Sequence, residues 1–223
     1  MSSGTNARAK SESPAANVNW LELDRSPHAI QFYSGDAFML DSLSRFVSTA
    51  LEAGDSCLVL ATQAHLEGLA ERLKARGVDT NSAAKKRRYV TVDAVQLLAQ
   101  LMVDEKLSKT RFDEFIREVF LPLKAAAEGK VQRVAGCGEV VGLLWADGKA
   151  EAAIELERLW NDVAKEGPCH LRCFYQIASF SDAGQNELFL KLCAEHADVI
   201  PPESQLHNVA ARAKEFESPP YGK

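Results

Sequence analysis

Two hydrophobic patterns alternate along the middle of the chain. Short continuous apolar runs, typical of strands buried on both faces, are separated by stretches with an apolar residue every three or four positions, typical of amphipathic helices. The first pattern predicts strands over His28–Tyr33, Cys57–Ala61, Tyr89–Val92, Val131–Ala135 and Leu171–Ile177. The second predicts helices over Ala37–Glu52, His65–Arg76, Ala94–Leu101, Arg111–Ala127, Lys149–Lys165 and Asn186–Ala197. Gly136–Glu139 reads as a loop, and Val140–Trp145 fits either a short helix or a further strand.

Regular alternation of strands and helices predicts the fold class. Such a chain forms a three-layer α/β/α domain with a mainly parallel central sheet. We expect one domain over residues 19–206, preceded by a disordered tail over residues 1–18. Residues 207–223 are expected to form a C-terminal helix or tail, with the helix around Asn208–Phe216.

Composition and charge narrow the classes of function. The 223 residues carry a net charge of −5, which disfavours nucleic acid as a direct partner. No apolar run is long enough to cross a bilayer, and Met1–Val18 has no apolar segment of the secretory type. We therefore expect a cytoplasmic protein that does not bind membranes, with its five cysteines reduced.

The carboxyl ends of the predicted strands point to a binding site. Ligands of open parallel sheets bind beyond these ends. Polar or aromatic candidates there are Tyr33, Ser34, Asp36, His65, Glu139 and Tyr175. For Asp36 and Glu139 the alternative is a capping role at a helix N-terminus, and for His65 it is the remnant of a lost catalytic position. Away from these ends, His28 is expected to make a structural hydrogen bond, and Trp145 and Trp160 to lie in the core.

The loop after the first strand has the position of a nucleotide-binding phosphate loop but not its chemistry. Phosphate loops combine glycines with a lysine that neutralises the phosphates and a hydroxyl that holds magnesium. Here a single glycine, Gly35, is followed by Asp36, and no Lys or Arg lies between Arg25 and Arg45. An acid at a helix N-terminus would repel a phosphate. ATP hydrolysis at this loop is therefore not expected.

Four residues near the C-terminus raise the question of zinc. Cys169 and Cys173 are spaced to share one face of a strand, and Cys193 and His196 to share one face of a helix. Zinc-binding cysteines usually lie on tight turns, whereas Cys173 lies inside an apolar strand, so buried inert thiols are expected instead. We expect no metal and no cofactor, and a zinc-dependent enzyme remains the alternative that metal analysis would decide.

The ordered part of the chain resembles the MEDS domain, a sensory domain of methanogen and methylotroph regulators. The resemblance covers about Ser26 to Ser204. It rests on His28–Tyr33, Asp36, Leu40, Ala53–Asp55, Leu58–Thr62, His65, Val92–Ala94, Arg111–Phe112, Gly138–Val141, Leu143–Trp145, Leu156–Asn161, Cys173–Tyr175, Cys193–His196 and Val199–Pro201.

The resemblance implies a RecA- or KaiC-like fold with a degenerate phosphate loop, in a domain that senses small organic molecules. Its relatives are often joined to histidine kinases or DNA-binding modules, and we expect this chain to act without such an appended module. We therefore expect a regulatory domain without catalysis that binds a small organic ligand and signals in trans to a histidine kinase or transcription regulator. Self-association as a homodimer is the other route for the signal. The alternatives are a KaiC-like nucleotide binder with an atypical loop and a protein-interaction module without a ligand.

Overall fold

The computed structural model describes residues 26–181 and 186–205. The predicted N-terminal tail over residues 1–18 and the predicted C-terminal helix or tail over residues 207–223 lie outside these ranges. Within them, no helix is long and apolar enough to span a membrane.

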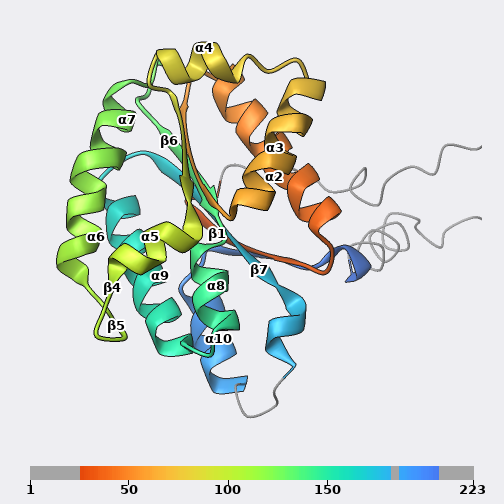
Figure 1. The fold of residues 1–223 in the computed structure, drawn as a ribbon, viewed down its shortest axis with the longest axis vertical. Coiled ribbons are helices and arrows are strands. Elements are labelled where there is room, and N and C mark those ends of the chain that lie inside the picture. The colour runs from red at the N-terminus through yellow and green to blue at the C-terminus, as the bar shows by residue number, and fades with distance from the viewer. Residues whose placement is uncertain (1–25, 182–185, 206–223) are drawn as a thin grey trace, which may run out of the picture.

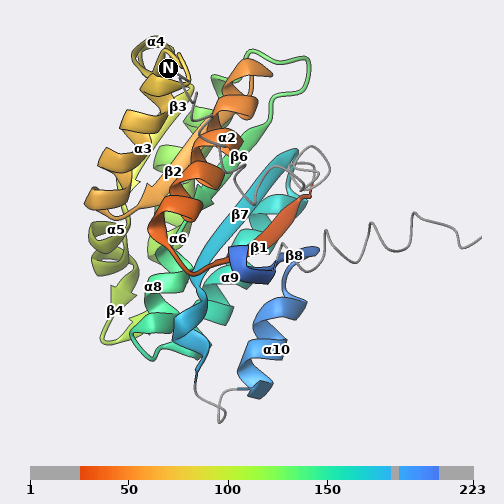
Figure 2. The same ribbon diagram turned by 90° about the vertical axis from the view of Figure 1, so that its right-hand side faces the viewer.

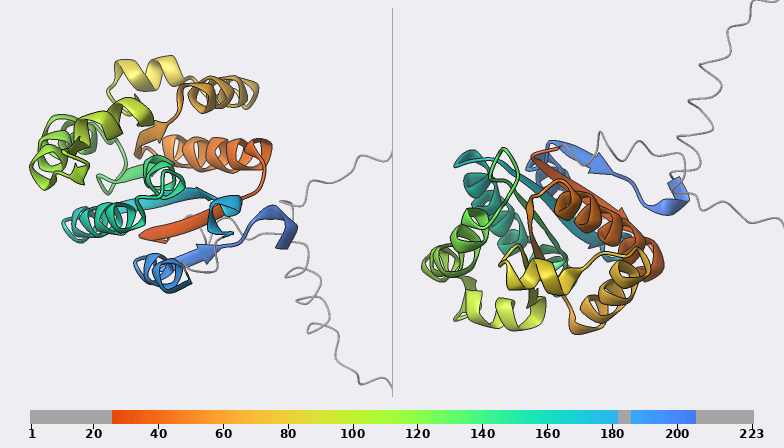
Figure 3. Two further views of the ribbon diagram at one scale, coloured as in Figure 1. Left: turned by 60° about the horizontal axis from the view of Figure 1, so that its bottom comes forward. Right: turned by 90° about the horizontal axis from the view of Figure 1, so that it is seen from above.

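A six-stranded sheet forms the centre of the molecule, and all of its strand pairs are parallel. Its strands are β1 (His28–Tyr33), β2 (Ser56–Ala61), β3 (Tyr89–Asp93), β6 (Val134–Gly138), β7 (Cys169–Gln176) and β8 (Asp198–Ile200). They lie in the order β3-β2-β6-β7-β1-β8. Figure 3 shows the blue β8 at the edge of the sheet beside the red β1. The predicted parallel sheet is confirmed.

Helices cover both faces of this sheet, as a three-layer domain requires. One face carries α2 (Asp36–Glu52), α3 (Gln63–Ala75) and α4 (Thr80–Lys85). The other carries α5 (Ala94–Leu101), α6 (Lys109–Phe115), a π-helical turn (Ile116–Phe120), α7 (Leu121–Ala125), α8 (Val140–Ala146), α9 (Ala150–Lys165) and α10 (Asn186–Ala194). Figures 1 and 2 show α2 and α3 on one side of the strands and α9 and α10 on the other.

The largest error of the sequence prediction concerns the fourth long strand. It was expected over Val131–Ala135 with a loop after it, but β6 begins at Val134 and runs through Gly138. Glycine normally weakens strands, yet here the strands approach so closely that a Cβ on Gly138 would lie 2.1 Å from the carbonyl oxygen of Leu60. Only glycine fits this position of the strand.

Several short elements were not predicted. They are α4, β8, the hairpin of β4 (Met102–Val103) with β5 (Lys106–Leu107), and a 3-10 turn over Ile177–Phe180. Val140–Trp145, which the pattern left open, lies within the helix α8 (Val140–Ala146). None of the short elements carries enough apolar positions to show a period.

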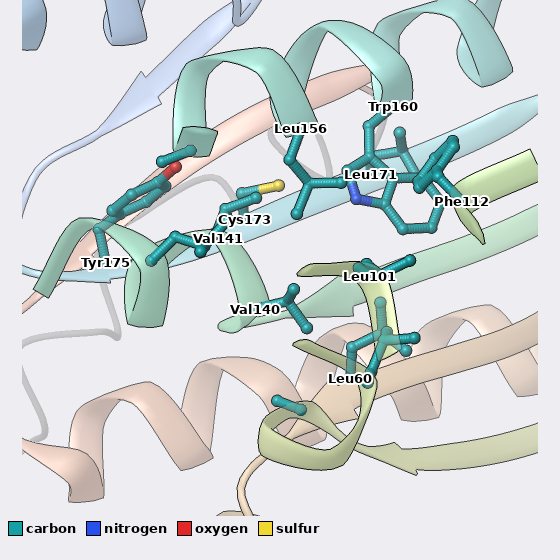
Figure 4. Close-up of a cluster of buried hydrophobic side chains, with 14 of the residues drawn as sticks. Leu60, Leu101, Phe112, Val140, Val141, Leu156, Trp160, Leu171, Cys173 and Tyr175 are labelled. Atoms are coloured by element: carbon teal, nitrogen blue, oxygen red, sulfur yellow. The ribbon is translucent and has the colours of Figure 1, made fainter. Parts of the chain in front are cut away.

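Two hydrophobic clusters, one on each face of the sheet, make up the core. Trp145 and Trp160 are buried in the larger one, as expected. Figure 4 shows Leu156 and Trp160 of α9 packed near Leu171 and Cys173 of β7. A cavity of about 30 Å³ lies in this layer, lined by apolar side chains that include Leu60 and Val140.

Candidate functional site

The candidate site lies where β1, β2 and β6 end. Tyr33 is the last residue of β1, Thr62 follows β2, and Glu139 follows β6. The amide of Glu139 donates to the carbonyl of Leu60, which extends the pairing of β6 with β2 and fixes the direction of the chain there. Three loops therefore meet at the carboxyl edge of the sheet, the position predicted from the strand pattern.

His65, near the start of α3, joins two carboxylates at this edge. Its Nδ1 lies 2.6 Å from Glu139 Oε1, and its Nε2 lies 3.6 Å from Asp36 Oδ1. The hydrogen bond to Glu139 raises the pKa of His65, burial opposes this shift, and the charges of Glu139 and Asp36 add to the increase. Protonated His65 therefore neutralises part of the negative charge of the two acids.

Glu139 is buried and does not cap the helix that follows it. It occupies the N-cap position of α8, but its side chain makes no capping bond there. Instead its Oε1 accepts a 2.8 Å hydrogen bond from the amide of Thr62, so the carboxylate crosses to the neighbouring loop. Asp36 is the first residue of α2 and not its N-cap, a position that Gly35 occupies.

Tyr33 adds a phenol to the same edge. Burial raises the pKa of Tyr33 well above its ordinary value, and the nearby carboxylates of Glu139 and Asp36 raise it further. The hydroxyl therefore stays protonated and can donate a hydrogen bond at every physiological pH.

The loop between β1 and α2 binds a carboxylate of the chain itself. The amide of Ser34 donates to Glu203 Oε2 at 2.9 Å, and the amide of Gly35 donates to Glu203 Oε1 at 2.8 Å. Glu203 comes three residues after β8, at the C-terminal end of the described chain. The backbone amides that would face a phosphate in a nucleotide-binding domain thus hold the C-terminal segment in place.

Tyr175 does not join the other predicted site residues. Phe32 pairs with Tyr175 and Tyr33 pairs with Gln176 across the β1–β7 ladder. Because successive side chains of a strand alternate between the two faces, Tyr33 and Tyr175 lie on opposite sides of the sheet. Tyr175 is fully buried there and donates a 2.7 Å hydrogen bond to Glu157 Oε1.

Glu157 belongs to a second polar cluster, which lies under α9. We call it the buried cluster; it consists of His28, Glu157, Cys173 and His196. His28 makes the structural hydrogen bond expected of it, with Nδ1 2.9 Å from Asn161 Oδ1. Of the four residues considered for zinc, Cys173 and His196 belong to this cluster, whereas Cys169 and Cys193 do not.

Sequence reasoning missed Glu157, although the sequence contains a signal for it. Ala153, Leu156 and Trp160 form the apolar stripe of α9, and position 157 lies on this stripe. Burial alone would raise the pKa of the Glu157 carboxyl, but the imidazoles of His196 and His28 outweigh it and hold the pKa far below its usual range. An acid on the buried stripe of a helix indicates such a partnered interior group.

The comparison with protein-family models agrees with the resemblance in the sequence. No curated protein is significantly similar to the chain. The model of the methanogen/methylotroph, DcmR sensory domain matches residues 27–190, which span β1 to α10 and include most of both polar clusters. This match covers well over half of the chain, and the protein therefore belongs to the MEDS family of sensory domains.

Proposed function

We propose that this protein is a sensory domain that binds a small organic ligand at the carboxyl edge of its sheet and reports it to a protein partner, without a reaction of its own. Membership of a sensory family supports the sensing role. The ligand would contact Tyr33, the backbone at Ser34 and Gly35, and the group formed by His65 and Glu139.

The bond from Glu203 to the β1–α2 loop is the observation that carries this proposal. Glu203 is a carboxylate held by two backbone amides, and its segment is otherwise tied to the sheet by the three-residue strand β8. A ligand with its own carboxylate could replace Glu203 at these amides without changing the charge of the site. Release of Glu203 would free the C-terminal segment, and that population shift would be the signal to the partner.

Electrostatics favours such a ligand over a nucleoside triphosphate. Asp36 and Glu139 both lie at this edge, and His65 is the cation that faces them. A triphosphate would bring several further negative charges to the acids without the lysine that phosphate loops provide. The strand–loop–helix arrangement of β1 and α2 supports descent from a RecA- or KaiC-like domain whose phosphate loop has lost this function.

Isothermal titration of the full chain tests the proposal with small carboxylic acids, alcohols, amines and Mg-ATP. The substitution Glu203→Gln weakens the internal competitor by about 1.5 kcal/mol, the lower end of the range for a hydrogen bond to a charged group, so a carboxylate ligand should bind roughly tenfold more tightly. Glu139→Ala and Tyr33→Ala should weaken binding. Glu71→Gln, an exposed position on α3, is the matched control and should change nothing.

Two outcomes would contradict the proposal. One is that no compound binds, which favours a protein-interaction module without a ligand. The other is that Mg-ATP binds and is hydrolysed, which favours an active nucleotide-binding domain.

A further inference from the structure

The buried cluster lies apart from the proposed ligand site and brings together four elements of the fold. His28 begins β1, Glu157 lies in the middle of α9, Cys173 lies within β7, and His196 follows α10. The side chains of Glu157 and His196 are completely shielded from solvent. We propose that His28, Glu157, Cys173 and His196 bind a divalent transition-metal ion of the zinc type in a closed, four-coordinate structural site.

The distances among three of the four donor atoms are close to those of a tetrahedral site, and all four lie within 4.8 Å of one another. His28 Nε2 lies 3.3 Å from Cys173 Sγ and 3.2 Å from Glu157 Oε2. Glu157 Oε2 lies 3.2 Å from Cys173 Sγ, and Glu157 Oε1 lies 3.3 Å from His196 Nε2. Zinc bonds of about 2.0–2.3 Å give tetrahedral edges of about 3.4–3.6 Å. An outward movement of a few tenths of an ångström would bring His28, Cys173 and Glu157 to these edges, and His196 Nε2, which lies within 4.8 Å of the other ligand atoms, would complete the site by a larger adjustment.

Neighbouring groups orient both imidazoles for coordination. The Asn161 amide nitrogen donates to the backbone carbonyl of Glu195 at 2.8 Å, so the Asn161 oxygen faces His28 and accepts from its Nδ1. In the same way, Nδ1 of His196 donates to the carbonyl of Leu192 at 2.9 Å. Each ring thus keeps its proton on Nδ1 and turns Nε2 toward the cluster. This is the outer-shell arrangement that metal-binding histidines show in proteins.

The Nε2 atom of His196 provides an independent observation. It is buried and makes no hydrogen bond of acceptable geometry with the described residues, although Glu157 Oε1 lies 3.3 Å away. Buried nitrogen atoms normally have a partner, because leaving one without costs about 1–3 kcal/mol. A metal ion at the centre of the cluster would supply the directed bond that Glu157, at ion-pair distance, does not make.

Charge balance also favours a divalent cation. A thiolate from Cys173 and a carboxylate from Glu157 neutralise the two charges of the ion, and both imidazoles stay neutral. The complete site then carries no net charge in the interior, where an unbalanced charge is costly. Binding releases two protons to solvent, one from the thiol of Cys173 and one from the imidazolium that pairs with Glu157 when no metal ion is bound. One sulfur, two imidazole nitrogens and a carboxylate suit zinc and cobalt better than calcium or magnesium.

The alternative is an interior network held by protons alone. Burial, together with the adjacent Glu157, raises the pKa of the Cys173 thiol well above its usual range, so in the absence of a metal ion the sulfur keeps its proton. Glu157 would then pair with protonated histidine. The two states differ in whether Cys173 is a thiolate, which spectroscopy detects.

Loading the full chain with cobalt distinguishes the metal-bound cluster from the cluster held by protons alone. The metal-binding model predicts one Co²⁺ per chain, a thiolate-to-cobalt charge-transfer absorption, and a higher melting temperature with Co²⁺ or Zn²⁺ than with a chelator. Cys173→Ser should abolish the absorption, and Asn161→Ala should weaken metal binding about 10–100-fold. Cys169→Ser and Cys193→Ser, at positions outside the cluster, are matched controls that should keep it.

Zinc-edge X-ray absorption of the wild-type protein removes any dependence on variants that fail to fold. The expected signal is one sulfur and three nitrogen or oxygen scatterers. Stoichiometric binding without sulfur, more than one sulfur per zinc, or folded wild-type protein that takes up neither metal would overturn the proposal.

Discussion

At the scale of single residues, His65 makes the stability of the protein sensitive to pH. Its pKa is raised in the folded state, mainly by the hydrogen bond to Glu139, so folding favours the imidazolium. That contribution is complete below the unfolded pKa near 6.5 and is lost as the pH rises through the higher folded value.

We therefore expect the free energy of unfolding to fall by roughly 1 kcal/mol, the range of a charged hydrogen bond in a partly exposed site, as the pH rises above the unfolded pKa of about 6.5. His65→Gln should remove this part of the slope, because an amide can bond to Glu139 but does not titrate. Urea unfolding at several pH values measures the effect. A slope that is the same in wild-type and variant protein would show that His65 is not its source.

The residue scale also shows what the sequence could and could not predict about the site. Strand ends identified Tyr33, Asp36, His65 and Glu139, which the structure brings to one edge because parallel strands finish there together. Tyr175 was grouped with them, but the pairing register sends it to the other face. Glu203 was missed because its role depends on how the chain returns after β8, which no local pattern encodes.

At the scale of elements, α9 combines an apolar stripe with one ionised group. Removing the carboxylate of Glu157 would leave His28 and the Tyr175 hydroxyl without the partner they share, and would remove the negative charge that faces His196. Removing one partner of a buried ion pair lowers the free energy of unfolding by about 3–5 kcal/mol.

Glu157→Ala should therefore lower the free energy of unfolding by about 3–5 kcal/mol, measured by urea denaturation. Glu155→Ala, on the exposed side of the same helix, should change it by no more than about 0.5 kcal/mol. Equal effects of the two substitutions would mean that the loss does not come from the buried cluster, since alanine itself favours the helix.

Long elements with many apolar positions were predictable from periodicity, and short or glycine-rich ones were not. The helices α2, α3 and α9 follow the predicted ranges closely, because each carries an apolar stripe through several turns. β6 was misplaced since Gly136 and Gly138 resemble a loop in composition. Their place in the strand depends on close neighbours, Leu171 for Gly136 and Leu60 for Gly138.

At the scale of the whole molecule, the C-terminal segment is joined to the rest of the described chain by a short strand and two side-chain hydrogen bonds. β8 has three residues at the edge of the sheet, and Glu203 adds two hydrogen bonds to the β1–α2 loop. Segments of this kind open locally at much lower free energy than the core.

Hydrogen exchange should therefore be faster in residues 198–205 of the Glu203→Gln variant than in the wild type, while β2 and β6 stay equally protected. Glu71→Gln serves as the control. Faster exchange throughout the sheet would indicate global destabilisation, and unchanged exchange would mean that the Glu203 bonds do not hold the segment.

The three-layer architecture was fully predictable, because it follows from alternation of strand and helix and needs no exact boundary. The addition of β8 at the edge was not, since three residues give no period. The buried cluster was not predictable either, because its members are spread over the chain from His28 to His196 and meet only through the order of the strands.

The strand order places residues of the candidate site and residues of the buried cluster on the same or neighbouring strands. Gly138 of β6 pairs with Cys173 of β7, and Glu139 follows Gly138 directly, while His28 and Tyr33 are the two ends of β1. Any coupling between the two positions must be reciprocal: a ligand that changes the dissociation constant of a metal ion by some factor has its own dissociation constant changed by the same factor. The concentration of ligand needed for a response would then vary with the supply of metal, and one small domain would integrate two inputs.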